Sequence, residues 1–132
     1  LWGSISDKIG RYKALMAMGC IVAISGFCLS KVNQAYGLFL IFAMLIAACY
    51  GGSMGVYPAL TADNFGPKNN GINYGIMFIG FALGGYVGPQ FFTSLMEQSG
   101  GSYAMPLTIV GVFGIVAIVL IFLLVKFRDS MK

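Results

Sequence analysis

The chain has 132 residues, of which 58% are apolar and only 9% are charged, and its formal net charge is +4. Soluble domains carry about 25% charged residues, so this composition excludes an ordinary soluble domain and favours a surface that faces lipid. A membrane-spanning helix needs about 20 mostly apolar residues, so a chain of this length holds four of them with short loops. The expected fold class is all-α and integral to the membrane.

The composition also excludes several functions. There is no histidine, the usual general base and the commonest metal ligand, so we expect no enzyme activity, no metal site and no cofactor. Nucleic-acid binding is not expected either, because the basic residues lie scattered at the ends of apolar segments and form no basic motif. Three cysteines without metal or redox spacing fall inside apolar runs, and we expect buried, inert thiols at Cys20, Cys28 and Cys49.

The first dense cluster of charge covers residues 3–13, which read G-S-I-S-D-K-I-G-R-Y-K. We expect a short loop where the chain leaves one membrane helix and enters the next, with Gly3 and Gly10 permitting the tight geometry. Asp7 and Arg11 are four residues apart, so their side chains can pair.

Four apolar segments follow, and each is expected to cross the membrane as a helix. Polar turns separate them at 31–35, 61–71 and 97–102, and a basic tail occupies 126–132. The last segment is almost uniformly aliphatic, so it and the first segment are expected at the periphery, facing lipid. The predicted spans are about 14–30, 36–60, 72–96 and 104–125.

The basic residues predict the orientation. When the stretch 3–13, the turn 61–71 and the tail are placed on one side, that side holds seven basic residues and the other holds only Lys31. Short loops rich in Lys and Arg face the cytoplasm, so both ends of the chain are expected inside. The seven residues are Lys8, Arg11, Lys13, Lys68, Lys126, Arg128 and Lys132.

No Asp, Glu, Lys or Arg lies inside a predicted span. A charge within the membrane is the usual marker of an ion or proton site. Leu1 and Trp2 resemble the end of an earlier apolar segment, so we expect the chain to be the C-terminal part of a larger protein. Any ion-coupling residue is then expected upstream of Leu1.

The order of residues in the stretch 3–13 resembles the loop signature of the major facilitator superfamily, G-x-L-A/S-D-R/K-x-G-R/K-R/K. Ile5 stands in place of the leucine, and Tyr12 in place of the last basic residue. In that family the motif lies between helices 2 and 3 and again between helices 8 and 9. Because four spans follow it here, the resemblance implies the last third of a twelve-helix transporter. The matching residues are Gly3, Ser6, Asp7, Lys8, Gly10 and Arg11.

Residues 57–75 narrow the resemblance. They read Y-P-A-L-T-A-D-N-F-G-P-K-N-N-G-I-N-Y-G, which is similar to the corresponding stretch of the oxalate/formate antiporter branch, near the monocarboxylate porters. Oxalate-carrying members have a lysine midway along helix 11, and the matching position here is Phe81. Since a second buried carboxylate without a cationic partner is costly, we expect a monocarboxylate or a less charged substrate, and not oxalate.

Two aromatic faces are candidates for substrate binding. Helical spacing places Tyr50, Met54 and Tyr57 on one face of the second span, and Phe78 and Phe81 on one face of the third, together with Tyr74. Lipid-facing or core packing also explains such faces. The resemblance favours a substrate path, because helices 10 and 11 line the central cavity in this branch.

The resemblance also implies gating and helix-packing residues. Glycines four apart on the third span permit the close approach of another helix, as expected at the interface between the two halves of such a transporter. The packing candidates are Gly80, Gly84 and Gly88, with Pro89 beside them. The candidates for a cytoplasmic gate are Gly3, Asp7, Lys8, Gly10, Arg11, Asp63 and Asn73.

The function that follows is secondary active transport of small organic anions, monocarboxylates above all, by alternating access as an antiporter or proton-coupled symporter. The expected location is the plasma membrane, as in a bacterial or archaeal inner membrane. The expected partners are the anion, the lipid bilayer and eight upstream helices of the same chain. Two alternatives stay open: a non-transporting four-helix structural protein, and a carrier from the same superfamily with a non-carboxylate solute.

Overall fold

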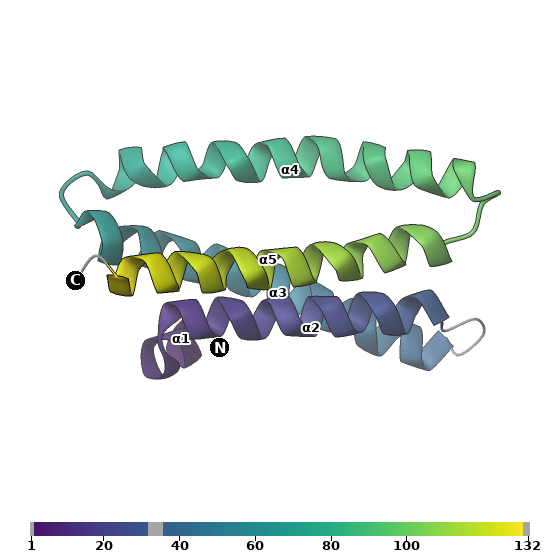
Figure 1. Cartoon of the computed structure of the whole chain (residues 1–132), viewed down its shortest axis with the longest axis horizontal. Helices are drawn as coiled ribbons and strands as arrows, with labels where there is room; N and C mark the ends of the chain where they lie inside the picture. Colours follow the sequence, from purple (N-terminus) through teal and green to yellow (C-terminus); the bar gives the residue numbers. More distant parts are fainter. Residues whose placement is uncertain (1, 32–35, 131–132) are drawn as a thin grey trace.

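The computed structural model describes residues 2–31 and 36–130, which form five helices (Figure 1). All-helical structure with four helices long and apolar enough to cross a membrane confirms the predicted fold class. Each predicted span lies inside one of these four. Residues 32–35 of the predicted turn, Leu1 and Lys132 lie outside the described residues. The helices are α1 (Trp2–Ile9), α2 (Arg11–Lys31), α3 (Tyr36–Phe65), α4 (Asn70–Gln98) and α5 (Ala104–Ser130).

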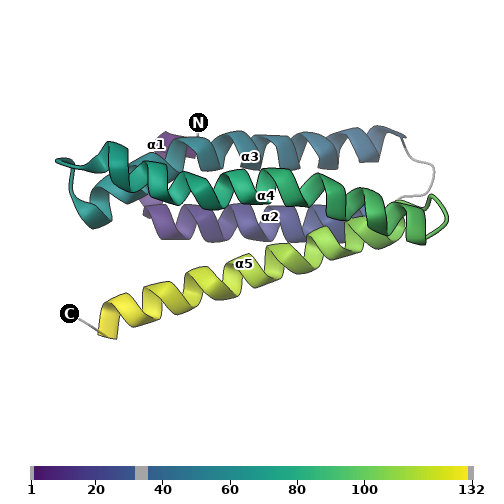
Figure 2. The same ribbon diagram turned by 90° about the horizontal axis from the view of Figure 1, so that it is seen from above.

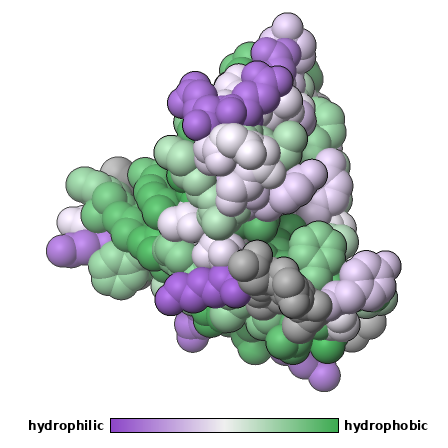
Figure 3. All heavy atoms as spheres, turned by 90° about the vertical axis from the view of Figure 1, so that its right-hand side faces the viewer, coloured by the Kyte–Doolittle hydropathy of each residue, from purple (hydrophilic) through white to green (hydrophobic). Residues whose placement is uncertain are grey.

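The four long helices run alongside one another, and their connections alternate between two ends (Figures 1 and 2). The α1–α2 junction, the α3–α4 turn and the end of α5 lie at the same end, on the left in Figure 1. This is the grouping from which the orientation was predicted. Figure 3 views the opposite end and shows hydrophilic side chains around it, with hydrophobic side chains over the flanks.

The charged stretch 3–13 is not a loop as predicted. Residues 2–9 form α1, and the break falls at Gly10, whose φ is +95°. The Gly10 amide donates to the Ser6 carbonyl at 3.0 Å, so the turn is as tight as a glycine in this region allows. Gly3 lies inside α1 and makes no turn. The prediction was wrong because a single glycine is enough to separate the two helices.

The second polar turn is shorter than predicted, because α3 continues to Phe65 with Pro58 inside it. Proline is more frequent in membrane helices than in soluble ones, and in the next turn Thr61 Oγ1 donates to the Tyr57 carbonyl at 2.8 Å. The helix ends at Gly66, with φ of +80° and Pro67 behind it. The tail is likewise helical as far as Ser130, the end of α5.

The apolar core lies between α2 and α3. It is formed by Leu15, Met18, Cys49 and Val56, and Trp2 of α1 packs against it. Cys49 is therefore buried as predicted, but Cys20 is exposed and Cys28 only partly buried. The prediction failed for these two because an apolar run in a membrane helix contains residues that face outward as well as inward.

The most extensive helix contact joins α2 and α5. A Cβ added to Gly26 would lie 2.7 Å from the backbone nitrogen of Gly111, and one added to Gly114 would lie 2.9 Å from the Cα of Ala23. Small residues thus let the two backbones meet, as in close membrane helix pairs. This contact joins α2 and α5 to each other, so their position at the periphery of the transporter stays a prediction; the other face of α5 is exposed.

α4 stands apart from the other helices (Figure 1). None of the residues in its most apolar window is buried in the described structure. A Cβ added at Gly80, Gly84 or Gly88 would meet no atom within 4 Å among the described residues. These predicted packing glycines therefore contact no other helix here, and a helix that packs on them remains a prediction. Pro89 and Gly88 line a hollow between α4 and α5.

Candidate functional site

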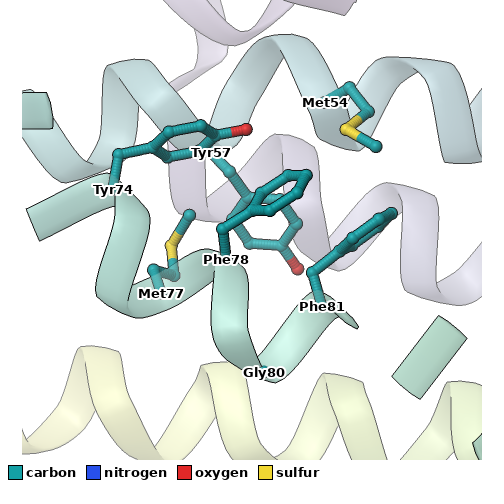
Figure 4. Close-up of a pocket in the computed structure, with 7 residues that line it drawn as sticks. All are labelled: Met54, Tyr57, Tyr74, Met77, Phe78, Gly80 and Phe81. Atoms are coloured by element: carbon teal, nitrogen blue, oxygen red, sulfur yellow. The ribbon is translucent and has the colours of Figure 1, made fainter. Parts of the chain in front are cut away.

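A pocket of about 300 Å³ lies between α3 and α4. Its walls are aromatic rings and methionine side chains that extend from both helices (Figure 4). Pockets of this size, lined by apolar and aromatic side chains with a few polar atoms, are typical of small-molecule sites. The lining residues are Met54, Tyr57, Tyr74, Met77, Phe78, Gly80 and Phe81.

Four rings form a continuous row that crosses from α3 to α4. The ring centroids of Phe78 and Phe81 lie 5.0 Å apart, with 26° between the planes. Tyr74 extends the row on one side, 5.5 Å from Phe78, and Tyr50 on the other, 5.7 Å from Phe81. All three separations fall in the range of favourable aromatic contacts, about 4.5 to 7 Å. The row exists because the helical spacing puts each set of rings on one face, and the two faces meet.

The structure brings together the residues predicted to bind substrate. Met54, Tyr57, Phe78 and Phe81 line the pocket, and Tyr50 joins it through its contact with Phe81.

The sequence prediction missed two residues of the lining. Met77 was not singled out, although its position three residues after Tyr74 places it near the aromatic face. Its sulfur also accepts a hydrogen bond from Thr61 Oγ1 at 3.5 Å. Gly80 was predicted only as a packing residue, but it forms part of the pocket wall.

The pocket is uncharged. Its lining, within the part of the chain that the structure describes, contains no Asp, Glu, Lys or Arg. The polar side-chain atoms are the hydroxyls of Tyr57 and Tyr74 and the two thioether sulfurs, as Figure 4 shows. Such a wall can bind a flat or apolar group and form hydrogen bonds, but it offers a carboxylate no opposite charge. Among the described residues no group of His, Cys, Asp and Glu is placed to hold a metal ion.

An ion-pair network lies where α1, α2 and α3 meet. Arg11 Nη1 is 2.8 Å from Asp7 Oδ1, which confirms the pairing predicted from the spacing. Arg11 Nε also donates to Asp63 Oδ2 at 2.5 Å, across 52 residues of sequence. Arg11 Nη1 donates to Ser6 Oγ at 3.2 Å as well. One arginine thus joins the end of α1 to the end of α3.

The carboxylates of this network are open to solvent. Their side chains are 60% exposed in Asp7 and 56% in Asp63, against 22% in Arg11. Exposed ion pairs of this kind contribute about 0.2 to 1 kcal/mol each to stability. Beside it, the Tyr12 hydroxyl donates to Asn64 Oδ1 at 3.0 Å.

Two of the predicted gate residues stand apart from this network. Lys8 is exposed on α1, and Asn73 on α4 makes no hydrogen bond or ion pair with the network among the described residues.

A chain with four spanning helices is a multi-pass membrane protein, and a pocket between two spans is the arrangement by which membrane transporters bind their solutes. The family model described as the Major Facilitator Superfamily matches residues 1–131, and the chain belongs to this superfamily of transporters. The resemblance stated from the two charged stretches is thereby confirmed.

Several curated proteins are similar to this chain. The oxalate:formate antiporter of Oxalobacter formigenes is 31% identical over 114 residues, which cover 85% of this chain and 27% of the antiporter. Apicoplast pyruvate carrier 2 of Toxoplasma gondii is 33% identical over 79 residues, covering 59% of this chain and 12% of the carrier. Riboflavin transporter RibJ of Trypanosoma brucei brucei is 28% identical over 87 residues, which cover 66% of this chain and 16% of that transporter. No solved structure matches significantly.

Proposed function

We propose that the whole protein is a secondary active transporter of small organic anions that carry one carboxylate, and that it works by alternating access. The chain spans 27% of the length of the antiporter to which it is similar, so it supplies one wall of the binding site. The observation that carries the substrate class is the absence of any charged side chain from the lining that the structure describes.

The uncharged lining favours a substrate with one carboxylate over a substrate with two. A single carboxylate can be paired by a group elsewhere in the protein while the rest of the substrate lies against this wall. The second carboxylate of a dicarboxylate would face Phe78 and Phe81 without a partner, and an unpaired buried charge is strongly unfavourable. Formate and pyruvate, which appear in the names of two relatives, each carry one carboxylate, whereas oxalate, which stands beside formate in the first name, carries two. Because one relative is named as a riboflavin transporter, a non-carboxylate solute is the second candidate.

We place the gate at the ion-pair network. In one conformation Arg11 holds Asp7 and Asp63 together, and in the other these contacts are broken as the two halves of the transporter rock. Gly10 supplies the bend that lets α1 and α2 approach this point. The Gly3 carbonyl accepts a hydrogen bond from Ser6 Oγ, which is itself a partner of Arg11. The described contacts give Lys8 and Asn73 no part in the network, so their gating role rests on the family resemblance.

The proposed orientation places this network in the cytoplasm. The α1–α2 junction, the α3–α4 turn and the end of α5 carry most of the basic residues, which favours the cytoplasmic side for this end. The proposed location is the plasma membrane, as in a bacterial or archaeal inner membrane. The open glycine face of α4, at Gly80, Gly84 and Gly88, is then available to helices from the upstream half.

Counterflow in liposomes that contain the full-length protein tests the substrate class. The liposomes are loaded with one unlabelled acid, and the uptake of labelled formate, lactate, pyruvate or oxalate is measured against protein-free liposomes. We expect exchange of at least one monocarboxylate, with oxalate inert. Strong oxalate exchange would contradict the uncharged-wall argument. No exchange across the panel would favour a non-carboxylate solute.

A further inference from the structure

The row of rings between α3 and α4 indicates which monocarboxylate is preferred, an inference that rests on the proposed transport function. We propose that the pocket binds a flat aromatic group, and that the preferred substrates are aromatic monocarboxylates, such as a 2-oxo acid with a phenyl ring. One-carbon and two-carbon acids then bind less well.

The ring geometry provides a surface on which another ring can stack. Phe78 and Phe81 are nearly parallel, and Tyr74 and Tyr50 extend the row at tilts of 50° and 37°. Phe78 is 38% exposed and Tyr50 58% exposed, so ring faces remain open after the contacts within the row are made. A bound aromatic ring gains offset or tilted contacts with several rings at once. The sulfurs of Met54 and Met77 also interact favourably with rings.

The size of the pocket favours a ring over a very small acid. Its volume is about 300 Å³, whereas an apolar cavity of about 150 Å³ already binds benzene. Formate has three non-hydrogen atoms and would leave most of this apolar surface uncovered. Because the favourable free energy of apolar binding scales with the area removed from water, the wall distinguishes substrates chiefly by their apolar part.

The polar atoms fix which end of the substrate faces this wall. The hydroxyls of Tyr57 and Tyr74 can each donate one hydrogen bond, but neither carries a charge that would pair with a carboxylate. The carboxylate is therefore directed away from α3 and α4, toward the part of the transporter beyond this chain. The aromatic end is the part that this wall recognises.

Phenylpyruvate and pyruvate test the inference, because they differ only by the phenyl ring. Counterflow of each labelled acid is measured in liposomes that contain the full-length transporter. The variants F78L and F81L remove a flat ring and keep an apolar side chain of similar size. F91L is the matched control, because Phe91 lies on the same helix but contacts Phe113 outside this pocket. Thermal unfolding of each purified variant checks that it is folded, and F78Y and F81Y, which restore a ring, should recover binding.

We expect a half-saturation concentration for phenylpyruvate at least about tenfold below that for pyruvate. F78L and F81L should raise the phenylpyruvate value about three- to tenfold and change the pyruvate value by a smaller factor, so that the preference for phenylpyruvate falls. F91L should change neither. Equal or better transport of pyruvate would overturn the inference and leave monocarboxylate transport standing, as would a phenylpyruvate preference that is undiminished in both F78L and F81L.

A binding arm separates failure of this inference from failure of the proposed function. Calorimetry with benzyl alcohol, an aromatic probe without a carboxylate, is performed on the purified full-length protein. If neither acid is transported, the carboxylate function fails; benzyl alcohol binding that F81L abolishes would still support recognition of a ring at this wall. No benzyl alcohol binding would overturn the inference.

Discussion

The α2–α5 pair and the α3–α4 pair solve the packing of two membrane helices in opposite ways. At the first, Gly26 and Gly111 remove the side chains and the backbones come into direct contact. At the second, rings and methionines keep the helices apart and enclose a pocket. The glycines let the two backbones approach closely, and the side chains of Phe27 and Ile118 pack beside them, so this contact leaves little free space. Side chains that line a pocket can rearrange, which suits a site that binds and releases a ligand.

The largest expected effect comes from adding a side chain at the contact between α2 and α5. Gly26→Leu places a side chain where even a Cβ would lie 2.7 Å from a backbone nitrogen of α5. Because a helix backbone cannot move aside locally, we expect a loss of at least about 3 kcal/mol in the free energy of unfolding. Equilibrium unfolding of the full-length protein in detergent measures it.

Gly51→Leu is the matched control for this prediction. A Cβ at Gly51 meets no atom within 4 Å among the described residues, so a change below about 0.5 kcal/mol is expected. Similar losses of unfolding free energy in both variants would contradict the contrast between the α2–α5 contact and the rest of the bundle.

The next largest effect comes from adding a charge to the pocket between α3 and α4. Phe81→Lys puts a cation on the pocket wall, where it can pair with a second carboxylate. A hydrogen bond to a charged group is strong enough to raise the ratio of oxalate to formate uptake about 10- to 100-fold. Counterflow with both labelled acids measures the ratio. Phe91→Lys, on the same helix outside this pocket, should leave it within about twofold; an unchanged ratio in Phe81→Lys would show that the wall does not face the substrate.

A smaller effect is expected where α2 and α3 are tied together. Arg11→Gln removes both ion pairs of the network, leaving Asp7 and Asp63 without their shared partner. Exposed ion pairs are weak, so we expect the transport rate to change about two- to fivefold while the unfolding midpoint hardly moves. Initial-rate uptake and thermal unfolding of the same preparation separate the two quantities. A large drop in stability with normal transport would show that the network is a brace and not a gate.

The smallest effect is expected for Asp7→Asn. Asp7 is the more exposed carboxylate, and in its absence Arg11 keeps its contact with Asp63. We expect transport to slow by about twofold or less, without unfolding. Asp63→Asn, which breaks the link between α2 and α3 instead, should slow transport more. Identical rates in wild type and Asp7→Asn would remove Asp7 from the gate.

The fold class, the four spans and the family could be predicted from the amino-acid sequence alone. These follow from the lengths of the apolar runs, the near absence of charge and the order of residues in two short stretches. The sequence also indicated the aromatic faces, because helical spacing alone puts Tyr50 and Tyr57 on one side of α3, and Phe78 and Phe81 on one side of α4. Such features are local, so they need no knowledge of how the helices meet.

Which helices contact one another, and through which residues, became clear from the three-dimensional arrangement alone. The uniform hydropathy of α5 gave no sign that Gly111 and Gly114 are buried against α2, because glycine in a membrane helix can face either lipid or a neighbour. The pairing of Arg11 with Asp63 joins residues 52 positions apart, which no local spacing predicts. The meeting of the two aromatic faces in one pocket likewise depends on the relative rotation of α3 and α4, a property that neither helix holds alone.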